Sequence, residues 1–162
     1  MDSEDFKREF NISAKIIYRK WLMDAIEKNE YESFKDCVLN LGIEWHVIRT
    51  VKKVKREDFY KNLWDNRKKI QNGTYSGWAE SPYDAYSYES KVCFLINPQY
   101  YKLIYDSKNR DAINEENFKS ANWQDVVDKY YEKDKKEFLK SEKNVLKIFE
   151  IDYYLWNKEK QS

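Results

Sequence analysis

The sequence predicts a single all-α domain, and three observations lead to this fold class. The chain has 162 residues, the size of one domain with its own core. It contains only three glycines and two prolines, fewer turn residues than a β-rich domain of this length needs. With 41% hydrophobic and 36% charged residues it is too apolar to be disordered. We therefore expect one domain of about seven helices over residues 1–162, frayed at residues 1–10 and 159–162.

Helical spacing of apolar residues places the elements of the first half. The predicted helices are residues 13–28, 31–41 and 56–71, with Ser13 as the cap of the first and Gly42 as the stop of the second. The segment IEWHVIRTVKKV fits both a short strand and a helix, and we predict a helix. The apolar stripe expected on the first helix consists of Ile17, Trp21, Leu22, Ala25 and Ile26.

The second half is predicted to begin with an aromatic-rich loop over about residues 75–88. A helix then ends at Asn97-Pro98, because the residue before a proline disfavours helical geometry. Asp106 is suited to cap the next helix. The remaining helices are expected over residues 123–140, capped by Asn122, and from Ser141 or Glu142 to about Lys158.

Charge and cysteine content exclude several function classes. Thirty basic and twenty-nine acidic residues give a formal net charge of +1, so only a local patch can serve nucleic-acid binding. Cys37 and Cys93 lie outside any CxxC motif and His46 is the single histidine, which argues against a zinc site and favours two buried free thiols. We expect no metal and no cofactor. No apolar run approaches the length of a membrane span and the N-terminal MDSEDFKREF is unlike a secretory signal, so we expect a cytoplasmic protein without membrane contact.

One carboxylate stands on an apolar helix face near the C-terminus. Asp152 is three or four residues from Ile148, Phe149, Leu155 and Trp156, so it shares their face. Burying an unpaired carboxylate costs several kcal/mol. Asp152 must therefore pair with a cation or with backbone amides, either as a purely structural group or as one that orients a functional side chain.

Three segments in the second half resemble a known family. The order ESKVCFLINP, IYDSKNRDAI and, after a long helix, IFEIDYYLW is similar to small bacterial proteins related to the helix-hairpin-helix DNA glycosylase superfamily, over about residues 85–158. The resemblance implies a glycosylase-like helical fold, with Lys91 at the Schiff-base nucleophile position and Asp106 at the catalytic aspartate position. Ser90 and Asp152 would support these two residues. The hairpin region itself, SPYDAYSYES, contains no glycine.

Both candidate catalytic residues also have purely structural interpretations. Asp106 can be a helix N-cap that accepts an amide of Lys108 or Asn109, which contributes about 1 kcal/mol. Lys91 can cover the core with its stem and pair its ammonium with Asp106, Asp152 or Glu89. A pair between Lys91 and Asp152 or Asp106 is the structural arrangement that we expect.

Basic and aromatic side chains are the candidates for contact with nucleic acid or with a protein partner. The densest cationic stretch, RTVKKVKR, supplies Arg49, Lys52, Lys53, Lys55 and Arg56. A smaller basic group near Asp106 consists of Lys102, Lys108 and Arg110, and the aromatic loop adds Trp78, Tyr83 and Tyr86. Each of these groups also has a structural interpretation, as a solvated face or as packed rings.

Two functions follow from these observations. The first is a nucleic-acid-associated protein resembling DNA glycosylases, either a base-excision glycosylase/lyase or a descendant without catalysis. The alternative is a non-enzymatic protein-binding module, such as an inhibitor or accessory factor encoded by a bacterial or phage mobile element. Lys91 and Asp106 in one open cleft with a basic rim would favour the first, whereas burial of both against Asp152 would favour the second.

Overall fold

The structure is a computed structural model and describes residues 2–75, 82–113, 123–132 and 144–157. The described residues form nine α-helices and two short 3-10 turns, without any strand. The all-α prediction is confirmed. The elements are α1 (Ser3–Glu27), α2 (Tyr31–Glu44), η1 (Ile48–Thr50), η2 (Lys53–Lys55), α3 (Arg56–Asp65), α4 (Arg67–Asn72), α5 (Tyr86–Ile96), α6 (Pro98–Tyr101), α7 (Ser107–Ile113), α8 (Trp123–Glu132) and α9 (Val145–Asn157).

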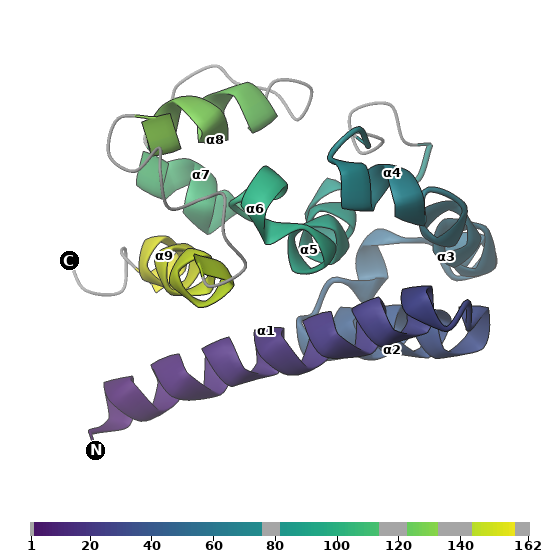
Figure 1. Ribbon diagram of the computed structural model, residues 1–162, viewed down its shortest axis with the longest axis horizontal. Helices are drawn as coiled ribbons and strands as arrows, with labels where there is room; N and C mark the ends of the chain where they lie inside the picture. The colour runs from purple at the N-terminus through teal and green to yellow at the C-terminus, as the bar shows by residue number, and fades with distance from the viewer. Residues whose placement is uncertain (1, 76–81, 114–122, 133–143, 158–162) are drawn as a thin grey trace.

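The long helix α1 forms one edge of the molecule (Figure 1). Its C-terminal half packs beside α2, and α3 and α4 complete that side. Its N-terminal half extends past α9, which lies with α7 and α8 on the opposite side. Between the two sides lies α5, so the groups on α5 face other helices rather than solvent.

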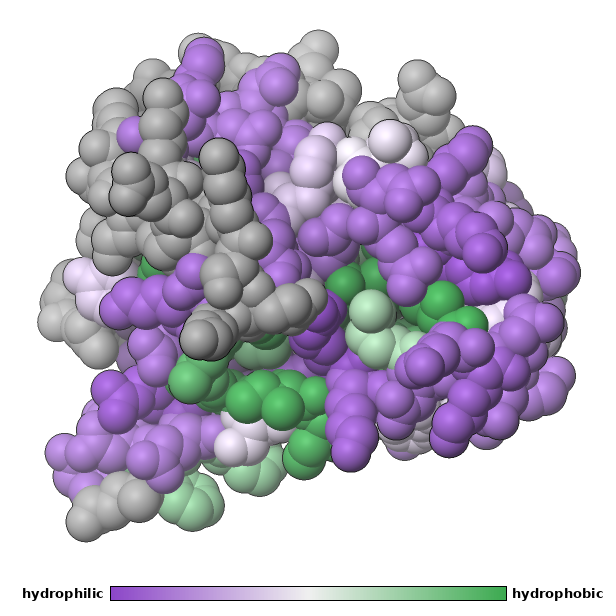
Figure 2. Space-filling view, viewed as in Figure 1, coloured by the Kyte–Doolittle hydropathy of each residue, from purple (hydrophilic) through white to green (hydrophobic). Residues whose placement is uncertain are grey.

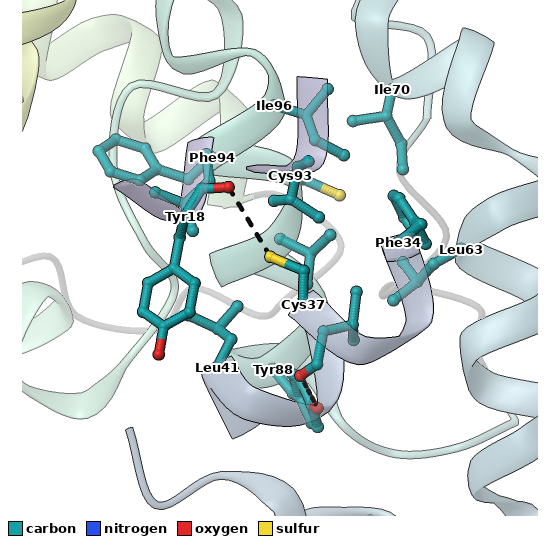
Figure 3. Packing of buried hydrophobic residues seen from close by; sticks show 14 of the residues in the cluster. Tyr18, Phe34, Cys37, Leu41, Leu63, Ile70, Tyr88, Cys93, Phe94 and Ile96 are labelled. Atoms are coloured by element: carbon teal, nitrogen blue, oxygen red, sulfur yellow. Dashed lines mark hydrogen bonds between the residues drawn. The ribbon is translucent and has the colours of Figure 1, made fainter. Parts of the chain in front are cut away.

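The core is built around α5, in which all nine residues from Tyr88 to Ile96 are buried. A helix that is apolar around its whole circumference must be enclosed, and Val92, Cys93, Phe94 and Leu95 meet this condition. Figure 3 shows side chains of this helix packed against residues of α1, α2, α3 and α4. Both cysteines are free and buried, as predicted, and burial raises the pKa of the Cys37 thiol to about 12.

Gly42 is not a helix stop, because α2 continues through it to Glu44. A Cβ at this position would overlap the phenol of Tyr88, whose hydroxyl donates to the Val38 carbonyl oxygen (Figure 3). Glycine is therefore needed here for close packing of α2 on α5. The helix ends at Glu44, and the chain then turns through His46, which has a left-handed φ of 59°, while the Val47 amide donates to the Gly42 carbonyl oxygen over 2.9 Å.

Two predictions for the first helix are wrong. The helix begins at Ser3, ten residues before the expected start, because Asp2 caps it by accepting the Asp5 amide at 2.8 Å. The residues expected to fray at the N-terminus are thus largely the first turns of α1. The apolar stripe is wrong only at Ile17, which is 64% exposed, because Leu22 and Ala25 are buried and Trp21 and Ile26 pack against the core. The buried residues of α1 are Ile12, Lys15, Tyr18, Leu22 and Ala25.

The helix count exceeds about seven because two predicted elements differ. The predicted helix 56–71 breaks at Asn66 into α3 and α4, and Pro98 begins the extra turn α6. The segment IEWHVIRTVKKV forms the end of α2 and the two 3-10 turns instead of a continuous helix. Asn122, Ser141, Glu142 and residues 159–162 lie outside the described residues. No helix in the described ranges is both long and apolar enough to span a bilayer.

Candidate functional site

A pocket of about 360 Å³ lies where α1, α5, α7 and α9 meet. It brings together three lysines and two aspartates from different parts of the sequence. Pockets of this size accommodate small molecules or a single exposed nucleotide unit. Its lining residues are Asn11, Lys15, Glu44, Trp45, His46, Lys91, Ile104, Asp106, Ser107, Lys108, Asp152, Tyr153 and Trp156.

Lys91 reaches this pocket from the buried helix α5 and is only 8% exposed. Its Nζ donates to Ser87 Oγ, one helical turn earlier, at 2.9 Å. It forms no ion pair with any carboxylate in the described part of the chain. Burial lowers the pKa of Lys91, and the nearby carboxylates of Asp106 and Asp152 oppose this only in part. The amine is therefore pushed toward its neutral, nucleophilic form.

Asp106 precedes α7 and caps it, as predicted. Its Oδ1 accepts the Asn109 amide at 2.8 Å, and the carboxylate remains half-buried at the pocket wall. Burial raises the pKa of Asp106, while Lys91 and the Asn109 amide act in the opposite direction. The cap and a proton-donating role are compatible, because the second carboxylate oxygen is not used by the cap.

Asp152 is nearly fully buried and accepts three hydrogen bonds, which satisfies the requirement deduced from its position on an apolar face. Its partners are Lys15 Nζ at 2.9 Å, the Ile104 amide at 3.1 Å and Asn109 Nδ2 at 2.9 Å. The expected pair between Lys91 and Asp152 or Asp106 is wrong, because Lys15 from α1 occupies the cationic position. Asp152 thus connects α1, α7 and α9 below the pocket.

Ser90 supports the site from the opposite side. Its Oγ accepts the Tyr105 amide at 2.9 Å and donates to the Ser87 carbonyl oxygen at 2.9 Å. Tyr105 directly precedes Asp106, so Ser90 fixes the approach of the α7 cap to α5. Lys91 also hydrogen-bonds to Ser87. Residues of α5 therefore position both Lys91 and the segment that carries Asp106.

The arrangement suits imine chemistry in which a lysine attacks a carbonyl carbon. Such a reaction needs an amine in its neutral form and a group that supplies a proton to the leaving water. Lys91 has a lowered pKa and Asp106 a raised pKa, and both line one pocket. Perturbed pKa values of opposite sense in one pocket are typical of functional sites.

The cationic stretch after α2 is exposed to solvent. The side chains of Arg49, Lys52, Lys53 and Lys55 are solvent-exposed. Arg56 differs, since its guanidinium donates to the carbonyl oxygens of Val51 and Ile48 and holds the turns in place. The stretch therefore supplies four available cations and one structural arginine.

The smaller basic group near Asp106 is mostly engaged within the protein. Lys102 Nζ pairs with Asp128 at 2.6 Å, and the Arg110 guanidinium lies 5.2 Å from the centre of the Tyr105 ring. Lys108 Nζ lies 5.4 Å from the Trp156 ring centre and lines the pocket. Lys108 is thus the member of this group placed to meet a ligand.

The aromatic candidates are packed rather than open. Tyr83 makes an edge contact with Phe59, and Tyr86 makes one with Tyr105. Trp78 lies outside the described residues. The rings that do line the pocket are Trp45, Tyr153 and Trp156, and the sequence pattern assigns this role to none of them.

Sequence reasoning misses several charged or polar pocket residues, among them Lys15 and His46. Lys15 carries a signal in retrospect, because it follows Ile12 by three residues and precedes Leu22 by seven, on the buried face of α1. His46 is exposed and also lines the pocket. Its placement results from the left-handed turn after α2, which the sequence pattern does not reveal.

Metal ligation finds no support within the described ranges, since they contain no group of three or more His, Cys, Asp or Glu side chains that could hold an ion. No known family model matches the chain, and no curated protein or solved structure matches it significantly. The function must therefore be inferred from the pocket and its surroundings.

Proposed function

We propose that this protein acts on nucleic acid in the manner of a base-excision glycosylase/lyase, with Lys91 as the nucleophile. The observation that carries this proposal is the meeting of Lys91 and Asp106, fifteen residues apart in the sequence, in one pocket. The substrate class is a nucleotide whose sugar C1′ is exposed, above all the aldehyde of an abasic site.

The chemistry assigned to the two residues balances. The neutral Lys91 amine adds to the C1′ aldehyde and forms a carbinolamine. Protonated Asp106 gives its proton to the carbinolamine hydroxyl, which leaves as water. The resulting iminium cation lies near the newly formed Asp106 carboxylate, which stabilises its charge.

The other pocket residues support substrate binding. Trp45, Tyr153 and Trp156 provide aromatic walls against which a sugar or base can stack. Lys108 at the pocket wall supplies a cation for a phosphate oxygen. Burial of Lys91 removes much of the hydration that would stabilise its protonated form, and this lowers the pKa of its amine.

Borohydride trapping on DNA that contains an abasic site tests the proposal. Reduction of the iminium should yield a covalent protein–DNA adduct for the wild type and none for Lys91→Met. Lys20→Met is the matched control, because it removes an exposed lysine that does not line the pocket. Adduct formation by Lys91→Met at the wild-type rate would refute the assignment.

A second candidate function, a protein-binding module, is favoured by one specific observation. Helix α1 presents Phe6, Phe10 and Ile17 to solvent, with exposures of 61%, 63% and 64%. Figure 2 shows hydrophobic residues at the surface along α1, between hydrophilic neighbours. Absence of both adduct formation and DNA retention by the wild-type protein would leave this candidate as the better explanation.

A further inference from the structure

We infer that residues 49–55 form the surface that docks the phosphate backbone of the nucleic acid and leads it to the Lys91 pocket. This inference rests on the proposed function and adds to it the binding surface and the recognised group. We call these residues the basic turn. Its cations are Arg49, Lys52, Lys53 and Lys55.

The charge of the basic turn is concentrated and unopposed. Four exposed cations occur within seven residues, and this stretch contains no acidic residue. None of the four forms an ion pair with a described carboxylate, whereas the nearest acidic residue in sequence, Glu57, pairs with Lys35 at 2.7 Å. Because the whole chain carries a net charge of only +1, the rest of the molecule is net acidic. The basic turn is therefore a local concentration of positive charge in a chain whose other residues are net acidic.

The basic turn is held in a fixed shape by its own buried and bonded atoms. Val51 is 1% exposed and anchors the turn in the core. Thr50 Oγ1 donates to the Val47 carbonyl oxygen at 2.6 Å, and Arg56 Nε donates to the Val51 carbonyl oxygen at 3.2 Å. Preorganised cations lose less entropy on binding than cations on a free loop.

The basic turn follows two pocket residues closely along the chain. Trp45 and His46 line the pocket, and Arg49 follows only three residues later. The reversal at His46 and the bond from the Val47 amide to the Gly42 carbonyl oxygen fix the direction in which the turn leaves α2. We infer that a strand bound along the basic turn continues toward the pocket residues Trp45 and His46.

The composition of the basic turn favours phosphates over an acidic protein surface. Three of its four cations are lysines, and lysine is depleted in the centres of protein–protein interfaces but typical of phosphate contacts. Val54 is 89% exposed between Lys53 and Lys55, so it can contact a sugar or base without disrupting the cation–phosphate contacts. One isolated exposed valine is too little for a protein-binding core.

Binding to a DNA duplex with a tetrahydrofuran abasic analogue tests the inference separately from the chemistry. This analogue has no aldehyde, so Lys91 cannot form an adduct and only docking is measured. Fluorescence anisotropy over a range of salt concentrations compares the wild type with two variants that each remove four positive charges. The basic-turn variant is Arg49→Gln/Lys52→Gln/Lys53→Gln/Lys55→Gln. The control variant replaces four exposed lysines elsewhere, Lys20→Gln/Lys28→Gln/Lys68→Gln/Lys69→Gln.

We expect the affinity of the basic-turn variant to fall by about tenfold or more. We also expect the slope of log affinity against log salt to flatten by about one unit for each phosphate that the variant no longer neutralises. The control variant should stay within about twofold of the wild type. Circular dichroism and thermal melting verify that both variants are folded. An equal decrease in affinity in the two variants would overturn the inference.

The failure of docking and the failure of catalysis give different results. Normal analogue binding by the basic-turn variant, with Lys91-dependent trapping intact, overturns the docking surface and leaves the proposed function standing. Weakened binding in that variant, with no trapping by the wild type, supports the surface and refutes the lyase chemistry. Displacement of the DNA by poly-glutamate at a lower charge concentration than by competitor DNA would overturn nucleic acid as the partner in favour of an acidic protein.

Discussion

Lys15 and Lys91 line the same pocket and are almost equally buried, with exposures of 3% and 8%, but only Lys15 has a carboxylate partner among the described residues. Lys15 donates to Asp152 at 2.9 Å, and Asp152 accepts two further hydrogen bonds. Lys91 donates to the hydroxyl of Ser87. On one side of the pocket, Lys15 and Asp152 thus form a hydrogen-bonded ion pair. On the other side, the Lys91 amine has no described carboxylate bonded to it.

The difference separates a structural lysine from a reactive one. A buried ion pair with all its hydrogen bonds made stabilises both charges in place. A buried amine without such a partner is driven toward the neutral form, and burial does lower the pKa of Lys91. The fold accommodates a lysine of each kind within one pocket, which makes each the natural control for the other.

Removing the Asp152 carboxylate, which pairs with Lys15, should change stability most. Asp152→Ala leaves the ammonium of Lys15 buried without a partner, so we expect the free energy of unfolding to fall by about 3–5 kcal/mol. Lys91→Met removes only one hydrogen bond, to Ser87, and should cost about 1 kcal/mol or less. Urea denaturation of the two variants measures both values. Similar decreases would show that the two sides of the pocket do not differ in the way described.

The pH dependence of stability distinguishes the two kinds of lysine as well. The pKa of Lys91 is lower in the folded protein than in the unfolded chain, so the unfolded chain takes up this proton first as the pH falls below about 10.4. The resulting destabilisation grows as the pH falls from that value to the folded-state pKa, and it is constant below the folded-state pKa. Relative to Lys91→Met, the wild type should therefore become less stable as the pH is lowered from about 10 toward 7. A difference between the two proteins that does not change with pH, in urea denaturation at each pH, would contradict this prediction.

The cap of α7 should give the weakest change in stability. Asp106→Ala removes the acceptor of the Asn109 amide and should cost about 1 kcal/mol. Asp106→Asn keeps a capping oxygen and should change stability by only a few tenths of a kcal/mol. Both variants should be inactive in borohydride trapping, because neither can supply the proton. An Asp106→Asn protein that unfolds like Asp106→Ala would show that the charge, and not the cap, holds this helix.

Much of the fold can be predicted from the sequence because local rules determine where its helices begin and end. Asn97-Pro98 ends α5, Gly73 adopts the left-handed φ of 72° after α4, and Asp106 caps α7. The start of α1 is harder to predict because Ser13 is an equally good capping type, and only the context selects Asp2. Gly42 resembles a helix stop in the sequence because its true role depends on Tyr88, which is distant along the chain.

The site is harder to predict because its contacts join residues that are far apart in the sequence. The burial of Asp152 follows from its place on an apolar face, and so does its need for a partner. The identity of that partner depends on the crossing of α1 and α9, since Lys15 lies 137 residues away in the sequence. For the same reason no local pattern indicates that Trp45, His46 and Trp156 line the pocket.

Site-resolved reductive alkylation of the native protein distinguishes a reactive Lys91 from a structural one. Glycolaldehyde and cyanoborohydride alkylate neutral amines, and peptide mass spectrometry reports the extent at each lysine as a function of pH. We predict that Lys91 is modified in the folded protein, with its half-maximal rate below the ordinary lysine pKa of about 10.4. Lys15 should be modified only after unfolding. If Lys91, like Lys15, were modified only in the unfolded chain, both lysines would be structural and Lys91 would not be a reactive amine.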